Sequence, residues 1–132
     1  MLPAPHRLTR GDDLRRVSRR GRRSASNTLV VHLLAHDPAS EDTPGPPTRV
    51  GFVVGRTVGN SVTRHRVQRR LRHLCRERLA TFPPGSELVV RALAPAGGAT
   101  YQELGADLDR CLQRALDDRR GDERHVGPGT VS

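Results

Sequence analysis

The stretch VGFVVGRTVGNSVTRHRVQRRLRHLCRER, residues 50–78, decides the fold of this chain. Its first residues, 50–54, form a short apolar run rich in β-branched side chains, which predicts a strand. Gly55 and Gly59 then loosen the backbone, and the Asn-Ser pair at 60–61 offers a side chain that can cap a helix. The stretch therefore predicts a strand, a turn and a helix that ends before the Pro-Pro-Gly sequence that follows.

This helix has two unlike sides when it is wound at about 100° per residue. The apolar side holds Val67, Leu71, Leu74 and Cys75, and the opposite side holds Arg66, Arg69, Arg72, His73 and Arg76. Six arginines and no acidic residue occur between Ser61 and Arg76. A solvated helix face would normally alternate acidic and basic residues at i,i+4 spacing. An uncompensated arginine face instead predicts a polyanionic partner, because the planar guanidinium fits phosphate oxygens.

Composition supports the same partner. The chain has 132 residues, 34% of them hydrophobic, which predicts one domain with a modest core. Its formal charge is +9 with a pI near 11.4, and all 23 basic residues are arginine. Eight arginines lie in residues 7–23 and eight more in residues 56–78. We expect residues 1–120 to form a single nucleic-acid-binding domain and residues 121–132 a flexible tail.

The cysteines and the apolar runs exclude other classes of protein. Cys75 and Cys111 are far apart and no CxxC occurs, which predicts buried thiols in a reducing compartment and no metal site. No apolar run reaches the roughly 20 residues of a membrane span, and the N-terminus lacks the apolar segment of a secretory signal. A cytoplasmic protein without a membrane association is expected.

A first helix is predicted near the N-terminus. Thr9 can cap it, with Asp12 three residues later in a position that resembles a capping box. Leu14 and Val17 give the helix a narrow apolar stripe, and Gly21 can end it.

Two more strands are predicted, at residues 28–35 and 86–92. The proline-rich segment 37–48 is expected to be a surface loop joining the first of these strands to the strand at 50–54, so that the two form a hairpin with a long tip. His32 is expected to be a strand-face histidine without a ligand role.

A last helix begins at a capping box formed by Thr100 and Glu103. Its apolar side consists of Leu104, Leu108, Cys111, Leu112 and Ala115. Residues 101–124 contain seven acidic residues and five arginines, so this helix should cover the core and not face the polyanion. The order of elements predicts an α+β fold, a two-layer α/β sandwich with a crossover through the arginine helix.

The arginine-rich stretch resembles the protein subunit of bacterial ribonuclease P. The resemblance rests on residues 51–54 followed by residues 58–72, which match the family pattern of roughly VGxAVxRNxxKRxxR. RRGR at 19–22 and LVVRA at 88–92 also fit, and the similarity covers about residues 5–118.

The resemblance implies a fold in the order αβββαβα, like domain 2 of ribosomal protein S5, with a left-handed crossover. In that family the protein joins a catalytic RNA that removes the 5′ leader of precursor tRNA. The RNA holds the magnesium ions, so no catalytic or metal-binding residue is expected in the protein, and no protein oligomer is required. The RNA-binding residues implied are Arg56, Asn60, Arg64, His65, Arg66, Arg69, Arg70, Arg72 and Arg76. A leader cleft between the first helix and the sheet would involve Leu14, Val17, Arg20 and Arg22.

The chain departs from the family pattern at several positions. His65 stands where asparagine is usual, Gln68 where lysine is usual, and Arg56-Thr57 where a basic pair is common. The first helix lacks the family's FxxVF aromatics, since Leu14, Val17 and Ser18 occupy those places. Leader bases would then be held by apolar packing or arginine stacking.

Two other classes of nucleic-acid-binding protein remain open from the residues alone. One is a ribosomal or RNA-chaperone-type protein without a processing role, and the other is a DNA-binding module with the arginine helix in a major groove. Stacking platforms of the RRM or OB type are disfavoured, because only Phe52, Phe82 and Tyr101 are aromatic.

Overall fold

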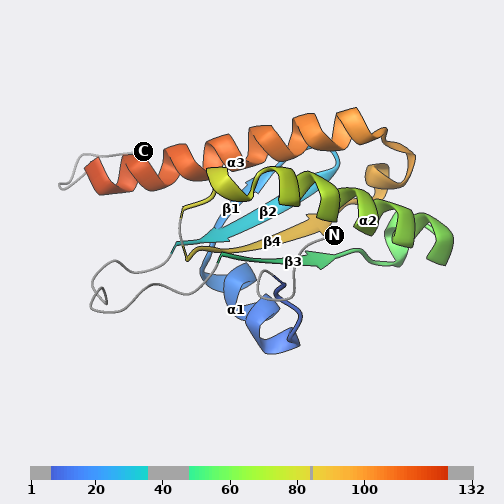
Figure 1. Ribbon diagram of the computed structural model, residues 1–132, viewed down its shortest axis with the longest axis horizontal. Helices are drawn as coiled ribbons and strands as arrows, with labels where there is room; N and C mark the ends of the chain where they lie inside the picture. The colour runs from blue at the N-terminus through green and yellow to red at the C-terminus, as the bar shows by residue number, and fades with distance from the viewer. Residues whose placement is uncertain (1–6, 36–47, 84, 125–132) are drawn as a thin grey trace.

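The computed structural model describes residues 7–35, 48–83 and 85–124, and Figure 1 shows their arrangement. The main elements are α1 (Gly11–Arg20), β1 (Arg22–Ala25), β2 (Leu29–Leu34), β3 (Arg49–Val53), α2 (Ser61–Glu77), β4 (Glu87–Ala92) and α3 (Tyr101–Arg124). The predicted αβββαβα order is confirmed. α3 continues past the predicted domain boundary at residue 120, and nearly all of the proline-rich loop lies outside the described residues.

The four strands form one sheet in the order β1-β2-β4-β3. β2 is antiparallel to both β1 and β4, whereas β3 is parallel to β4. The predicted hairpin between β2 and β3 is therefore wrong, because β4 lies between these two strands. The crossover through α2 is confirmed, since parallel neighbours require such a connection. The left hand of this crossover stays a prediction.

Helices α2 and α3 pack on one face of the sheet, and α1 packs on the other (Figure 1). The larger core joins one face of the sheet to the apolar sides of α2 and α3 and includes Leu29, Val31, Val50, Leu71, Leu88, Val90, Leu104 and Leu108. A smaller cluster of Leu8, Val17 and Val89 lies under α1, with Leu14, Leu34 and Val53 packed against it. The sheet with α2 and α3 makes up the two-layer sandwich, and α1 covers part of the opposite face.

The caps of α2 and α3 form as predicted. The Asn60 side chain accepts a hydrogen bond of 2.9 Å from the Thr63 backbone N–H. Thr100 and Glu103 form a reciprocal capping box with distances of 2.8 and 3.1 Å. Each cap satisfies backbone donors that the first helical turn leaves open.

The C-terminal end of α1 lies where it was predicted, but its N-terminal end does not. Its N-cap is Arg10, with no side-chain cap bond, so the predicted Thr9 cap is wrong. The helix ends before Gly21, whose backbone is extended. A Cβ at Gly21 would lie 2.6 Å from the Val17 carbonyl oxygen and 3.1 Å from the Leu33 backbone, so a close approach to β2 requires glycine there.

The two edges of the sheet are partly covered by other segments. Along β3, Arg7 pairs with Val50, and the Leu8 N–H donates to the Val50 carbonyl at 2.9 Å. At β1, the Arg114 guanidinium of α3 donates to the Ala25 carbonyl at 2.8 Å.

Candidate nucleic-acid interface

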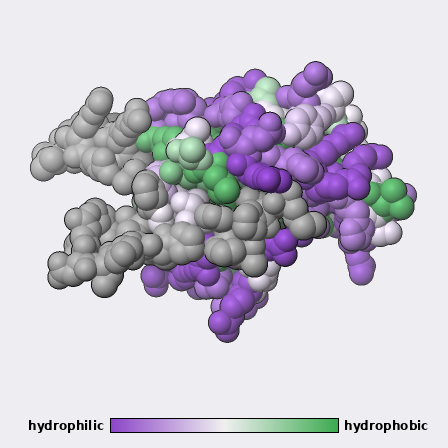
Figure 2. Space-filling model, in the orientation of Figure 1, coloured by the Kyte–Doolittle hydropathy of each residue, from purple (hydrophilic) through white to green (hydrophobic). Residues whose placement is uncertain are grey.

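The predicted orientation of α2 is confirmed. Val67, Leu71, Leu74 and Cys75 are buried, and burial raises the pKa of the Cys75 thiol to about 12. His65, Arg69, His73 and Arg76 are exposed on the opposite side, and Arg64, Arg66, Arg70 and Arg72 are half-buried. In the orientation of Figure 1, the surface over α2 is mainly hydrophilic (Figure 2).

The exposed face of α2 carries hydrogen-bond donors that are not bonded to other described residues of the protein. A hollow of about 220 Å³ on this face is lined by His65, Gln68, Arg69, Arg72 and His73. Within the part of the chain that the structure describes, none of these five side chains forms a hydrogen bond or an ion pair. Together with Arg76, they leave guanidinium and imidazole groups available to an external anion.

Three other sequence-predicted residues lie at the N-terminal end of this face. Arg56 is exposed on the short 3₁₀ turn Arg56–Val58 that precedes α2. The side-chain oxygen Oδ1 of Asn60 accepts the capping bond from the Thr63 N–H, which leaves the side-chain NH₂ group of Asn60 as a donor. The Nε of Arg64 is buried and has no hydrogen-bond partner among the described residues.

Two of the predicted RNA-binding arginines already have partners within the protein. Arg66 donates from Nη2 to the Gly97 carbonyl at 3.3 Å, and Arg70 donates from Nη1 to the Ala99 carbonyl at 3.1 Å. Both acceptors belong to the loop between β4 and α3. Helical phase alone placed Arg66 with the exposed arginines, and the approach of this loop was not visible in the sequence.

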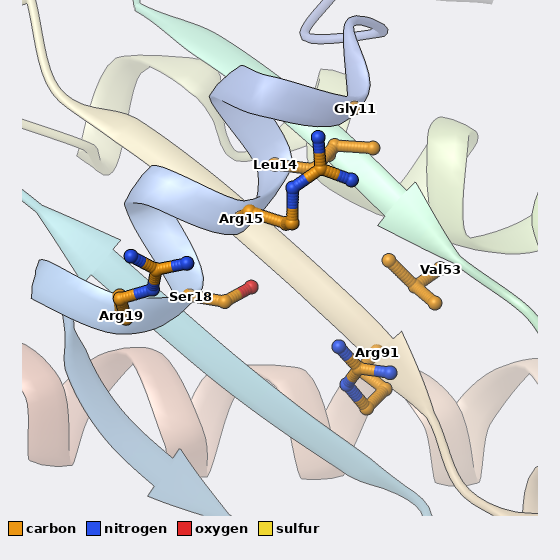
Figure 3. A pocket seen from close by; sticks show the side chains of 7 residues that line it. All are labelled: Gly11, Leu14, Arg15, Ser18, Arg19, Val53 and Arg91. Carbon is orange, nitrogen blue, oxygen red and sulfur yellow. The ribbon is translucent and has the colours of Figure 1, made fainter.

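A second basic site lies between α1 and the sheet, where a cleft was predicted. A pocket of about 400 Å³ is bounded by α1 on one side and by Val53 of β3 and Arg91 of β4 on the other (Figure 3). Its α1 side consists of Gly11, Leu14, Arg15, Ser18 and Arg19. Leu14 and Val53 supply apolar surface, and three arginines surround it. The pocket therefore combines a surface for a flat apolar group with donors for phosphates.

Of the four predicted cleft residues, only Leu14 lines this pocket. Val17 is fully buried and packs in the core under α1. Arg20 is exposed and Arg22 lies on β1, but neither lines the pocket. Arg91 was missed from the predicted cleft residues. Alternation along the strand places it on the same face as Val89, two residues earlier, and Val89 packs under α1.

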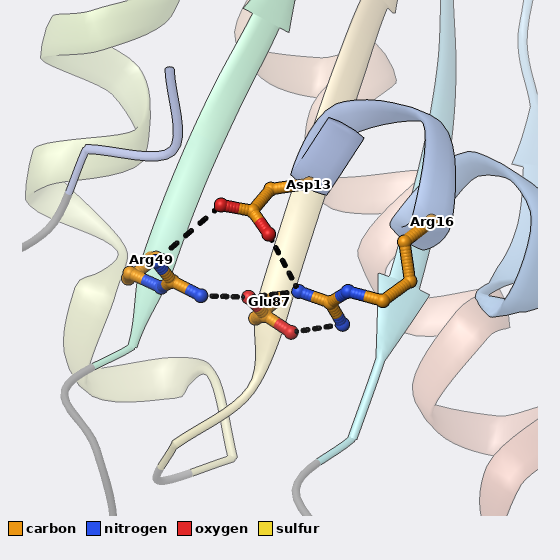
Figure 4. Close-up of polar contacts among 4 residues, drawn as sticks. All are labelled: Asp13, Arg16, Arg49 and Glu87. Atoms are coloured by element: carbon orange, nitrogen blue, oxygen red, sulfur yellow. Dashed lines mark hydrogen bonds and ion pairs between the residues drawn. The ribbon is translucent and has the colours of Figure 1, made fainter. Parts of the chain in front are cut away.

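An ion-pair cluster attaches α1 to the first residues of β3 and β4 (Figure 4). Arg16 makes two hydrogen bonds to the Glu87 carboxylate, at 2.7 and 2.8 Å, and a third to Asp13 at 3.3 Å. Arg49 also binds Glu87 and lies 3.9 Å from Asp13. The hydrogen bonds from Arg16, and the charges of Arg16 and Arg49, hold the pKa of Glu87 below its ordinary value despite partial burial. The bonds to Glu87 also raise the pKa of Arg16.

His32 lies on the α1 side of β2, as a strand-face histidine. Its side chain is buried and its Nδ1 atom has no hydrogen-bond partner within the described chain. Burial lowers the pKa of His32, and the charges of Arg91 and Arg23 lower it further. Arg91 and Arg23 therefore lie close enough to His32 to oppose its protonation.

α3 covers the core, as predicted, and carries acids. Arg78 at the end of α2 binds the Asp109 carboxylate at 2.6 and 3.2 Å, which ties α2 to α3. Asp107 is buried and binds Thr28 and Arg110. Burial opposes ionisation of Asp107, but these hydrogen bonds outweigh it and lower its pKa. Two of the acids of α3 are therefore paired with arginines within the protein.

A metal site would need clustered ligands, and a membrane span would need a long apolar helix. In residues 7–35, 48–83 and 85–124, no group of three histidine, cysteine, aspartate or glutamate side chains could hold a metal ion. None of the helices in those segments is both long enough and apolar enough to cross a bilayer.

Known structures share this fold. The Staphylococcus aureus RNase P protein aligns with a TM-score of 0.69 and 22% identity, covering 83% of this chain and 94% of that protein. The Thermotoga maritima RNase P protein aligns with a TM-score of 0.66 and 20% identity, covering 82% and 96%. At these identities the likeness establishes the fold alone.

Sequence relatives establish the family. The family model described as Ribonuclease P matches residues 2–116. A ribonuclease P protein component from Nocardioides sp. is 54% identical over 114 residues, which is 86% of this chain and 94% of the relative. One from Streptomyces avermitilis is 52% identical over 118 residues, which is 88% and 96%. With a family match over most of its length and relatives at more than half identity, this chain belongs to the ribonuclease P protein family.

Proposed function

We propose that this protein is the protein subunit of the ribonuclease P ribonucleoprotein and promotes removal of the 5′ leader from precursor tRNA. The observation that carries the proposal is the arginine face of α2, which has no acidic residue between residues 61 and 76, presented by a member of this family. Its partner is the ribonuclease P catalytic RNA, and precursor tRNA is the substrate.

The two basic surfaces suit two parts of the RNA. On α2, Arg69, Arg72 and Arg76 point away from the core and have no protein partner within the described residues, which suits the phosphates of the catalytic RNA. The pocket under α1 suits a single-stranded leader. Leu14 and Val53 can contact a base, while Arg15, Arg19 and Arg91 can stack on it or bind its phosphates. This pocket provides surfaces for the leader although α1 has no aromatic residue.

In this proposal the protein supports a reaction whose chemistry belongs to the RNA subunit. Magnesium too is held mainly by the RNA subunit in this proposal. Arginine side chains near the RNA lower the repulsion between phosphates of the catalytic RNA and the substrate. Substrate and magnesium then bind at a lower ionic strength. The site of action is the cytoplasm.

A reconstitution with the matching catalytic RNA and precursor tRNA tests the proposal. Protein alone should leave the precursor intact, RNA alone should cut it only at raised magnesium, and the two together should cut it at low magnesium. Purifying the protein from cells with its bound nucleic acid tests the alternative functions. Recovery of ribosomal RNA or duplex DNA in place of the catalytic RNA would contradict the proposal.

His65 gives a sharper test of the division of labour. It is exposed on α2 and stands where asparagine is usual in the family, so one could assign it a role as a general base. We expect His65→Asn to keep low-magnesium activity. If this variant binds the RNA normally but loses the cleavage step, a protein side chain takes part in the chemistry.

A further inference from the structure

The loop between β4 and α3 is wedged against the start of α2. Its 3₁₀ segment, Ala94–Gly98, is folded on itself by bonds from the Ala96 N–H to Leu93 at 2.9 Å and from the Ala99 N–H to Ala96 at 3.3 Å. Ala96 and Ala99 are buried. The loop is therefore an ordered part of the core and presents the carbonyls of Gly97 and Ala99 toward α2.

Gly97 lets this loop approach the turn before α2. A Cβ at Gly97 would lie 2.2 Å from the Val58 carbonyl oxygen, which is too close for any side chain. Gly98 differs, because a Cβ there would meet no atom within 4 Å. The loop thus touches the 3₁₀ turn Arg56–Val58 through Gly97, and its carbonyls are set at a fixed place beside α2.

Arg66 and Arg70 bind these two carbonyls from successive turns of α2. They are four residues apart, so they lie one above the other on the same side of the helix. Two bonds along the axis to one rigid loop oppose rotation of α2 about its axis. The direction in which Arg69, Arg72 and Arg76 point depends on that rotation.

We propose that Arg66 and Arg70 are positioning residues, which clamp α2 to the 94–99 loop and so aim its exposed arginines at the RNA. This inference rests on the proposed function, since it concerns the same RNA-binding face. It separates two groups of arginines on one helix. Arg66 and Arg70 stay on the loop carbonyls in the complex, whereas Arg69 and Arg76 neutralise phosphates.

A substitution that leaves every charge in place tests the clamp. Gly97→Ala should displace the loop carbonyls, and Gly98→Ala is its matched control. We measure the Kd of each full-length variant for the catalytic RNA across a range of salt concentrations. Gly97→Ala should bind roughly tenfold more weakly, the loss expected when one misdirected arginine gives up a charged hydrogen bond to phosphate. The slope of log Kd against log salt should become shallower, by about 0.7–0.9 for each phosphate contact that the misdirected arginines give up. Gly98→Ala should match the unmodified protein.

Three results would overturn the clamp. One is Gly97→Ala binding as tightly as the unmodified protein or more tightly, because arginines released from the loop would then serve equally well on phosphates. Another is an unchanged or steeper salt slope in this variant, because the exposed arginines would then still reach their phosphates, and the last is an equal loss in both glycine variants. Failure of the unmodified protein to bind the catalytic RNA would instead contradict the proposed function, so the two failures are distinguishable.

A measurement on the unmodified chain decides the matter if Gly97→Ala does not fold. An arginine-selective dicarbonyl reagent, read out by mass spectrometry, reports the accessibility of each guanidinium with and without RNA. Arg69 and Arg76 should react in the free protein and be protected by the catalytic RNA. Arg66 and Arg70 should be slow to react in both states. If Arg66 and Arg70 react as fast as Arg69 in the free protein, the clamp is refuted.

Discussion

The Glu87 cluster gives the most direct test of how α1 is held over its pocket. Glu87→Gln keeps the shape of the side chain and removes its charge. The Glu87 side chain is 14% exposed and that of Arg16 is 34% exposed. Hydrogen bonds to charged groups contribute about 1.5–3 kcal/mol when buried, and exposed ion pairs about 0–1 kcal/mol. Because a third of Arg16 is exposed to solvent, we expect a loss of roughly 1–3 kcal/mol in the free energy of unfolding at pH 7.

For a domain of this size, such a loss should lower the Tm by roughly 3–15 °C. Thermal and urea unfolding, followed by circular dichroism, measure it. Asp12→Asn is the control, because it removes a carboxylate from the same helix whose partner, Arg15, is also exposed. Its effect should stay below about 0.5 kcal/mol. The Glu87 variant should also bind a single-stranded leader oligonucleotide less well, since the pocket wall would be less firmly attached.

The pH dependence provides the sign test. The folded state holds the pKa of Glu87 below the 4.5 of a free carboxyl, chiefly through the hydrogen bonds from Arg16. The stabilisation is therefore fully present above about pH 4.5 and is lost as the pH falls through the lower folded value. The difference in stability between the two proteins should shrink in that range, because protonated glutamate resembles glutamine. A difference that stays the same at pH 3 and pH 7 would refute the reasoning.

Three shorter predictions follow from α2. Leu71→Ala should cost roughly 2–5 kcal/mol in thermal or urea unfolding, because the side chain is fully buried, while the folded variant should keep its RNA affinity. Arg69→Ala should change stability by less than about 0.5 kcal/mol yet reduce the salt slope of RNA binding by about 0.7–0.9, and an unchanged slope would place Arg69 off the RNA. The Cys75 thiol, with its pKa raised to about 12, should not react with a thiol reagent at pH 8 until urea unfolds the chain, so rapid labelling of the native protein would contradict its burial.

The parts of the fold that depend on local pattern were predictable from the sequence. The apolar spacing of α2 fixed which side faces the core, and the Thr100 and Glu103 pair fixed where α3 begins. Each of these signals lies within a few residues. The start of α1 was predicted wrongly because a suitable residue, Thr9, stands one position before the true N-cap.

The pairing of strands was not predictable from the same signals. β2 and β3 are consecutive in the chain, but β4 enters between them after the crossover, and strand patterns do not encode neighbours. β1 is only four residues long and has two arginines, so it carries little strand pattern. The family resemblance supplied that strand.

In the candidate site too, features set by local pattern were predictable and long-range contacts were not. The exposed arginines of α2 follow from helical phase, whereas the loop that binds Arg66 and Arg70 comes from about 30 residues further along the chain. The Arg16–Glu87 pair spans 71 residues of sequence. Contacts between residues so far apart in the chain depend on tertiary packing, which the residue pattern of a single sequence does not reveal.

The covered sheet edges bear on how this protein behaves before it meets RNA. An open edge strand offers unpaired backbone groups to a second chain, and strand addition is a common route to aggregation. Here the Val50 carbonyl on β3 is taken by Leu8, and the Ala25 carbonyl on β1 is taken by Arg114. These two contacts leave fewer open acceptors for a second chain to pair with, and the formal charge of +9 opposes the approach of another copy.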